Sequence, residues 1–274
     1  MDTRVPTVTS LIRAGFLVLA VAAPLAAQDD VARRAGCQGL PSHAQLVSAL
    51  KAAQSESNGM LKNQMWGTVV NRDGIVCAVA FTGKGRGDQW PGSRVISAQK
   101  ANTGNEFSLP PGVSGAFPKG LALSSANLYS AVQPGGNLFG LQESNPVDHG
   151  VAYRGLAANF GRASDPMVGG RIGGVNVFGG GLPLYNARHE VVGGLGVSGD
   201  TSCADHNVAY RTRHTLQLDH VPAGVSGDPT RADTIVYDVV AQAGQMPGVS
   251  ASGWGHPACF PADVTASGTL PATR

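Results

Sequence analysis

Residues 179–205 constrain the fold most, because they specify a hairpin that leads directly into a helix. Three consecutive glycines at 179–181 permit backbone conformations that other residues resist, and the apolar run 191–197 suits a buried strand. We expect the chain to reverse at residues 186–189. The run Ser202-Cys-Ala-Asp205 has the spacing of a capping box, which predicts a helix that starts near Ser202.

The density of glycines around this predicted strand indicates that another group approaches the backbone closely. Three partners satisfy the pattern: a neighbouring subunit, a flat ligand, or the tight hairpin itself. Only 14% of the residues are charged and 38 are glycine, which favours a homo-oligomer, a dimer or larger, over a loop-rich monomer.

Hydrophobic periodicity predicts both helices and strands along the rest of the chain. Strand-like runs at 65–70 and 75–81 flank Asn71-Arg-Asp-Gly74, which suits a hairpin turn. The other predicted elements are helices at 42–54, 93–107, 124–132 and 202–216, and strands at 175–178 and 234–239. We interpret residues 28–274 as a single domain, with an insertion at about 112–174 and a Gly/Pro-rich C-terminal arm from about residue 241.

Residues 1–27 have the layout of a secretory signal peptide. Arg4 and Arg13 precede a short apolar core at 14–21, and small residues lead to a cleavage site after Ala27. The apolar core is too short for a membrane span, so we expect an exported protein, periplasmic or extracellular. Removing this segment leaves 18 of the 20 basic and 17 of the 18 acidic residues, so positive and negative charges nearly balance. A nearly neutral chain argues against nucleic acid as a partner.

The four cysteines form an even set, which in an exported chain predicts disulfides. Three pairings are possible. We favour Cys37–Cys77 and Cys203–Cys259, because each pair joins a terminal arm to an element that the pattern places in the core. A catalytic Cys203–His206 pair is the alternative, but a free thiol seldom persists outside the cytoplasm.

Four ordered motifs resemble the GlcG/HbpS-type haem-binding family, in its longer, exported form. They are Val69-Val-Asn-Arg-Asp-Gly74, Ser97-Ala-Gln-Lys-Ala-Asn-Thr-Gly-Asn-Glu-Phe107, the Gly-Gly-x-Pro turn within residues 179–183, and the Val-Gly-x-x-Gly-Val-Ser-Gly pattern within residues 191–199. The resemblance implies an α+β fold with a central antiparallel β-sheet flanked by helices, a profilin-like α/β sandwich. It also implies oligomers that bind haem or, in some relatives, a corrinoid, without an established catalytic step.

A haem requires an axial donor, cations for its propionates and an apolar slot. The candidate cofactor-binding residues are Lys100, Thr103, Gly179, Gly180, Gly181, Ser198, His206 and Tyr210. Lys100 and Thr103 lie three residues apart on a predicted helix and therefore share a face. The simpler interpretation makes Lys100 a solvated charge and gives Thr103 a hydrogen bond back to its own helix.

The predicted helix after Ser202 carries His206, Tyr210 and His214 at four-residue spacing, with Arg213 nearby. One interpretation is a donor stripe for haem or iron, with His206 and His214 as metal ligands. The other is the solvent-exposed side of an amphipathic helix. A catalytic zinc normally has three protein ligands, and no His-Glu-x-x-His run occurs.

The resemblance and the candidate donors together predict an exported haem-binding protein for uptake, storage or sensing, with a corrinoid or iron as alternative ligands. Two other functions stay open: a structural or interaction oligomer without a ligand, and a small hydrolase or redox enzyme. The enzyme would use His206 or Ser198, although Gly196-Val-Ser-Gly-Asp200 has Asp where a nucleophile elbow has its last glycine.

Overall fold

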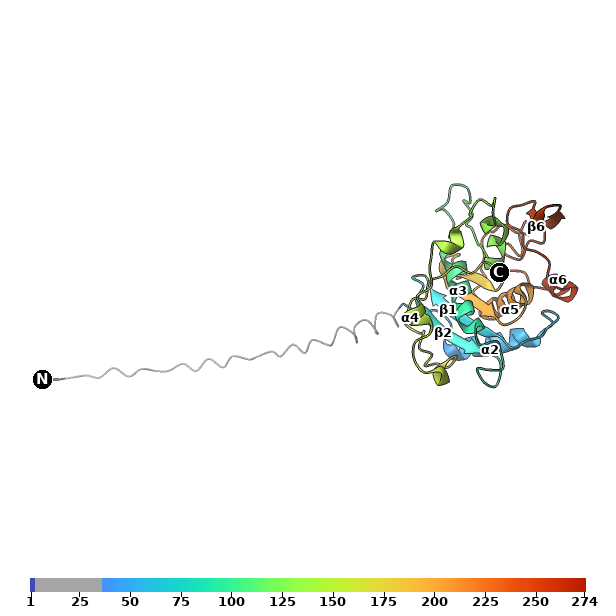
Figure 1. The fold of residues 1–274 in the computed structure, drawn as a ribbon. Helices are drawn as coiled ribbons and strands as arrows, with labels where there is room; N and C mark the ends of the chain where they lie inside the picture. The colour runs from blue at the N-terminus through green and yellow to red at the C-terminus, as the bar shows by residue number, and fades with distance from the viewer. Residues whose placement is uncertain (3–35) are drawn as a thin grey trace.

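The computed structural model describes residues 1–2 and 36–274, so the predicted signal peptide lies almost entirely outside the described residues. The centre of the molecule is a four-stranded antiparallel sheet (Figure 1). Its strand order is β2-β1-β4-β3. Its strands are β1 (Trp66–Asn71), β2 (Val76–Phe81), β3 (Gly181–Tyr185) and β4 (Val191–Ser198). Because β1 pairs with β4, the two hairpins join at the middle of the sheet.

Three helices cover the two faces of this sheet. They are α2 (His43–Ser55), α3 (Ser93–Glu106) and α5 (Ser202–Thr215). Both hairpins and these three helices confirm the elements that periodicity predicts. Ser42 caps α2 through a capping box with Gln45, because each side chain accepts a hydrogen bond from the other residue's backbone N–H. The α+β class with a central antiparallel sheet is therefore confirmed.

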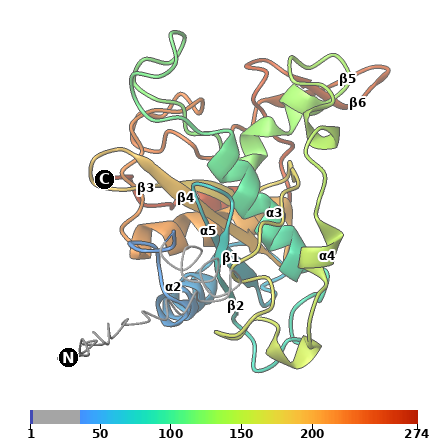
Figure 2. The same cartoon turned by 90° about the vertical axis from the view of Figure 1, so that its left-hand side faces the viewer.

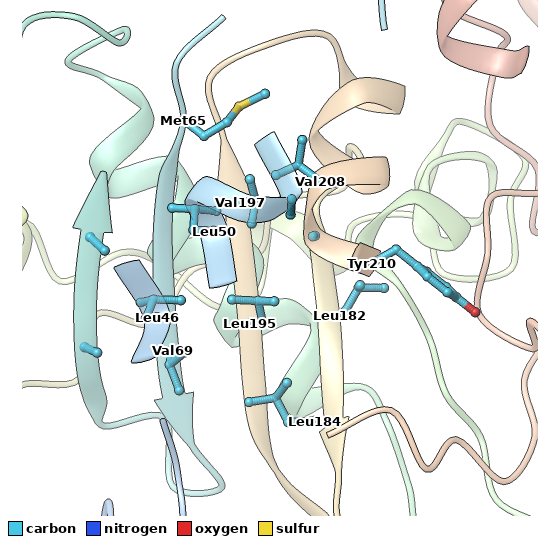
Figure 3. Packing of buried hydrophobic residues seen from close by; sticks show 14 of the residues in the cluster. Leu46, Leu50, Met65, Val69, Leu182, Leu184, Leu195, Val197, Val208 and Tyr210 are labelled. Carbon is cyan, nitrogen blue, oxygen red and sulfur yellow. The ribbon is translucent and has the colours of Figure 1, made fainter. Parts of the chain in front are cut away.

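The helices α2 and α5 share one face of the sheet. Leu46 and Leu50 of α2 and Val208 of α5 pack against alternate strand residues, among them Leu195 and Val197 (Figure 3). This alternation is what the two-residue period of a strand requires when both faces are covered. The opposite face of the sheet is covered by α3 (Figure 2).

The helix α3 lies unusually close to β3 and β4, because glycines face it. A Cβ at Gly196 would overlap the carbonyl oxygen of Ser97, and one at Gly194 would overlap that of Ala101. A Cβ at Gly104 of α3 would reach within 2.7 Å of the Leu182 carbonyl carbon. The close approach predicted from the glycines is therefore made at these positions by a helix of the same chain.

Replacing Gly196 by alanine should lower the free energy of unfolding by about 2–3 kcal/mol, because the added methyl group must push α3 away from the sheet. Urea unfolding of the variant measures this loss. The matched control is Gly87→Ala, at a glycine with nothing within 4 Å of the added atom. Equal stability of the two variants would contradict the packing argument.

The segment between α3 and β3 contains short helical turns instead of one helix. The helix predicted at 124–132 is two 3-10 turns, η1 (Ser125–Leu128) and η2 (Ser130–Val132). Further along come η3 (Leu141–Glu143), α4 (His149–Ala152) and η4 (Ala157–Asn159). A buried ion pair between Arg94 of α3 and Asp165 attaches this segment to the α3 face of the sheet.

Two predicted strands and one predicted cap are wrong. Residues 175–178 form no strand, since the N–H of Asn176 bonds the Thr103 hydroxyl instead of a neighbouring strand. Residues 234–238 are also irregular. The predicted capping box of Ser202 and Asp205 is not formed, because Thr201 caps α5 by accepting the N–H of Ala204. The hydroxyl of Ser202 instead accepts a hydrogen bond from the N–H of Gly179.

The C-terminal part of the chain returns to the N-terminal end of α5. It contains β5 (Val239–Gln242), β6 (Gln245–Ser250) and α6 (Pro261–Ser267), of which α6 and the β5–β6 hairpin were not predicted. Both favoured disulfides, Cys37–Cys77 and Cys203–Cys259, are confirmed. No helix in the described part of the chain has the length and apolar character that a membrane crossing requires.

Candidate functional site

A buried ion pair joins the two helices on opposite faces of the sheet. The Nζ atom of Lys100, on α3, lies 2.7 Å from a carboxylate oxygen of Asp205, on the first turns of α5, and neither side chain is exposed. Lys100 also donates to the carbonyl of Val197 and lies 3.7 Å from the centre of the Phe178 ring. The second oxygen of Asp205 accepts the N–H of Asp200.

Burial is the largest influence on the pKa of both Lys100 and Asp205. It lowers the pKa of Lys100 and raises the pKa of Asp205 to about 7, while the attraction between the two charges opposes both shifts. Removing either partner would leave a charge in a place that water does not reach.

His206 follows this pair on α5 and has no hydrogen-bond partner. Its side chain is fully buried, and both ring nitrogens are unpartnered among the described residues. One turn later the buried hydroxyl of Tyr210 is also unpartnered, with the two ring centres 5.8 Å apart. Burial lowers the pKa of His206 to about 3, so its imidazole is neutral, with a free lone pair, near neutral pH.

A second buried ion pair, between Arg213 and Asp233, lies near Tyr210. Arg213 donates from Nη2 to Asp233 at 2.8 Å, and from Nη1 to the carbonyl of Pro183. The guanidinium lies 4.8 Å from the centre of the Tyr210 ring. Asp233 raises the pKa of Arg213 although burial opposes this shift. We call Lys100, Asp205, His206, Tyr210 and Arg213, with Phe178 and Asp233, the α3–α5 cluster.

The structure brings together several of the predicted site residues. A Cβ at Gly179 would lie 3.0 Å from the Cβ of His206, and one at Gly180 would lie 3.2 Å from the Nζ of Lys100. A Cβ at Gly181 would overlap the Lys100 carbonyl. The three glycines therefore let the loop before β3 pack onto the α3–α5 cluster.

Three other predicted site residues lie outside this group. His214 is eight residues beyond His206, about 12 Å along the helix, and it bonds Asp219. Thr103 donates to the carbonyl of Gln99, as the simpler interpretation predicts. Ser198 is buried at the end of β4, and no hydrogen bond among the described residues joins it to a histidine.

Two simpler interpretations from the sequence are wrong. Lys100 is not a solvated charge, and the His206, Tyr210 and Arg213 side of α5 is not exposed to solvent. Lys100 is buried against Asp205, and the C-terminal part of the chain covers this side of α5. Asp233 pairs with Arg213, His256 bonds Ser202, and the N–H of His256 bonds the carbonyl of Val236, which holds these two stretches together.

Phe178, Asp233 and His256 were not recognised as site residues. Phe178 falls in the stretch misjudged as a strand, and Asp233 lies 20 residues beyond its partner Arg213. A buried lysine and a buried arginine each require a carboxylate, but sequence alone does not say which carboxylate pairs with each. His256 lies in the Gly/Pro-rich C-terminal arm, where no periodicity places a side chain.

The sequence model of the family described as haem-degrading, HbpS-like proteins matches residues 42–213. This range is more than half of the chain. The chain belongs to the HbpS-like family. None of the curated proteins compared with it matches its sequence.

Several solved structures resemble the chain at low identity. Protein ORFY of Klebsiella pneumoniae is 21% identical, with 76% of this chain and 97% of that chain covered and a TM-score of 0.40. The PduOC:heme complex is 19% identical over 63% and 89%, with a TM-score of 0.40. A double mutant of Streptomyces reticuli HbpS is 15% identical over 77% and 99%, with a TM-score of 0.35.

The region matched by the HbpS-like family model does not include every residue of the α3–α5 cluster. The match ends at Arg213, so every residue of the cluster except Asp233 lies inside it. The part of this chain after residue 213 therefore adds buried groups that contact α5, namely Asp233 at Arg213 and His256 at Ser202.

The neutral His206 should make the fold sensitive to acid. Its pKa is about 3 when folded but about 6.5 when unfolded, so the unfolded state binds more protons between these values. Stability is therefore lost as the pH falls. Relative to a His206→Phe variant, the protein should lose about 3 kcal/mol more between pH 6.5 and pH 4.

Urea unfolding at both pH values measures this difference. His149→Phe, at an exposed histidine, is the matched control and should follow the unmodified protein. Parallel pH profiles for the unmodified protein and His206→Phe would show that His206 carries no such penalty.

Proposed function

We propose that this protein binds haem, and that His206 provides an axial ligand to its iron. The observation that carries the proposal is a fully buried imidazole with no partner at either nitrogen. Buried polar groups are nearly always hydrogen-bonded, so an exception requires an explanation, and a ligand that takes the lone pair is one. Membership of the HbpS-like family and the heme named in the PduOC structure support this choice of ligand.

The donor chemistry of the α3–α5 cluster fits haem in part. The neutral imidazole of His206 is a common axial ligand, and the unpartnered Tyr210 hydroxyl is a second donor one turn away. Phe178 offers an aromatic face. Bound haem would supply an iron centre whose reactivity depends on these surroundings. Lys100 and Arg213 already pair with carboxylates, so each must exchange its partner before it can hold a propionate.

The C-terminal part of the chain covers the helix that carries His206. The residue is fully buried, and Asp233 and His256 bond Arg213 and Ser202 of its helix. This part of the chain is attached to α5 by the Cys203–Cys259 disulfide. We infer that haem enters where it lifts from α5. The two disulfides fit an oxidising compartment, in which the protein would serve haem uptake, storage or sensing.

Titration of haemin, followed by visible absorption, tests this proposal. A saturable spectral change at a fixed haem-to-chain ratio is expected for the unmodified protein. His206→Phe should weaken binding at least about tenfold, or about 1.4 kcal/mol, because the phenyl ring fills the same space but has no lone pair. His149→Ala removes an exposed histidine and should bind like the unmodified protein.

Equal binding and identical spectra for His206→Phe and the unmodified protein would overturn His206 as the ligand. A change no larger than that of denatured protein would overturn haem binding itself. The same titration with cobalamin distinguishes a corrinoid ligand from haem.

A further inference from the structure

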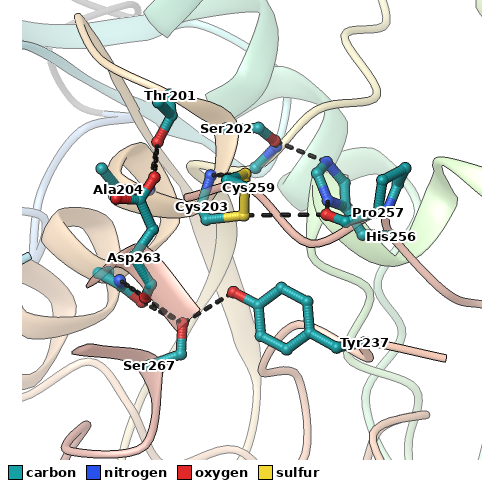
Figure 4. The surroundings of a disulfide bond; sticks show 12 residues. Thr201, Ser202, Cys203, Ala204, Tyr237, His256, Pro257, Cys259, Asp263 and Ser267 are labelled. Atoms are coloured by element: carbon teal, nitrogen blue, oxygen red, sulfur yellow. Dashed lines mark hydrogen bonds between the residues drawn. A yellow bond between two sulfur atoms is a disulfide. The ribbon is translucent and has the colours of Figure 1, made fainter. Parts of the chain in front are cut away.

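A second group of metal-binding side chains lies at the N-terminal end of α5. The donor atoms of Cys203, His256 and Cys259 all lie within 4.8 Å of one another. Figure 4 shows the disulfide near the His256 ring, and Ser202, the first residue of α5, hydrogen-bonded to that ring. No other group of three such side chains meets within the described ranges 1–2 and 36–274.

The hydrogen bonds of His256 prepare one ring nitrogen for a metal. Nδ1 lies 2.7 Å from the carbonyl oxygen of Pro257, which can only accept, so Nδ1 carries the hydrogen. Nε2 therefore has the lone pair, which accepts a hydrogen bond from the Ser202 hydroxyl at 2.7 Å, and a metal would take the place of that hydrogen. An imidazole that donates its other N–H to a backbone carbonyl is the usual arrangement of a metal-ligating histidine.

The two cysteines are also placed to act as thiolates once they are reduced. The N–H of Cys203, in the first turn of α5, points to the sulfur of Cys259 at 3.2 Å. A helix N-terminus and a backbone donor both favour a negatively charged sulfur. Cys203 is fully buried, whereas Cys259 is partly exposed, so a small reductant can reach the bond from the Cys259 side.

We propose that reduction of the Cys203–Cys259 disulfide creates a zinc site formed by Cys203, His256 and Cys259. A small dithiol supplies two electrons and two protons, becomes a disulfide itself, and leaves two thiols on the protein. Zn²⁺ then replaces the two thiol protons and binds two thiolates and one imidazole. Water takes the fourth position of the tetrahedron. With the disulfide intact the site does not exist, because bonded sulfurs are not thiolates.

This inference does not depend on haem binding. The zinc ligands surround the start of α5, whereas the proposed iron ligand, His206, is unpartnered further along the helix. The other disulfide provides an internal control, because Cys37 and Cys77 belong to no such donor group among the described residues.

Titration with Co²⁺, a spectroscopic substitute for Zn²⁺, tests the site in protein treated with a dithiol under anaerobic conditions. The Cys37→Ser/Cys77→Ser variant keeps only the two proposed cysteine ligands, together with His256. When reduced, it should show thiolate-to-cobalt charge-transfer bands that saturate at one Co²⁺ per chain and disappear when Zn²⁺ is added. The oxidised form should show none. His256→Asn in the same background should weaken binding more than about tenfold.

The matched variant Cys203→Ser/Cys259→Ser should show no saturable thiolate bands after the same reduction. The proposal is overturned if these bands persist in that variant, or if His256→Asn binds Co²⁺ as tightly as its parent. It is also overturned if the reduced Cys37→Ser/Cys77→Ser variant keeps its native circular dichroism but binds no Co²⁺. If that variant loses its native circular dichroism, the same titration of the reduced unmodified protein decides, and absence of saturable bands there overturns the proposal.

Discussion

Replacement of Lys100 by methionine is expected to lower the free energy of unfolding by about 3–5 kcal/mol, because it leaves the buried carboxylate of Asp205 without its cation. Methionine keeps most of the length of the lysine stem, so the loss reports the charge more than the packing. The contact of Nζ with the Phe178 ring is lost in the same variant. Urea unfolding at pH 8 measures the effect.

The double variant Lys100→Met/Asp205→Asn is the matched control. Asparagine can still accept the N–H of Asp200 but carries no charge, so it should recover most of the loss. The single variant should also regain stability as the pH falls. Without Lys100, the pKa of Asp205 in the folded state stays above its unfolded value, so the folded state takes up the extra proton. A loss independent of both pH and Asp205 would contradict the charge argument.

The core of the fold could be predicted because its signals are local. The strand period and the Asn71–Gly74 turn each depend on residues within a few positions of one another. The disulfides could be paired because each joins an arm to a predicted core element. The glycines of β4 indicated a close approach correctly, but not that α3 makes it, because packing between distant segments leaves no local pattern.

The candidate site could be predicted only as a set of residue types. The polar residues of α5 look like an exposed face, since histidine, tyrosine and arginine at helical spacing usually face water. They are buried because Arg213 forms an ion pair with Asp233 and because the Cys203–Cys259 disulfide attaches the C-terminal arm to the helix. Residues 234–238 support this return with single hydrogen bonds, such as that between Val236 and His256, instead of a strand ladder. Periodicity cannot detect such a segment.

The disulfide Cys203–Cys259 should limit the access of haem to His206. The Cys203→Ser/Cys259→Ser variant is expected to lose about 4 kcal/mol of stability, because the bond closes a loop of 56 residues. Because the C-terminal arm is then free to lift from α5, haemin should also associate faster. Urea unfolding and stopped-flow absorption measure the two effects.

The other disulfide separates lost stability from access. Cys37→Ser/Cys77→Ser opens a loop of 40 residues and should cost a similar amount, about 4 kcal/mol. That bond joins the N-terminal arm to β2, and neither cysteine belongs to the α3–α5 cluster. Haemin should therefore bind this variant at the rate of the unmodified protein. If both variants associate with haemin equally fast, general loosening explains the rate and the arm is not the barrier.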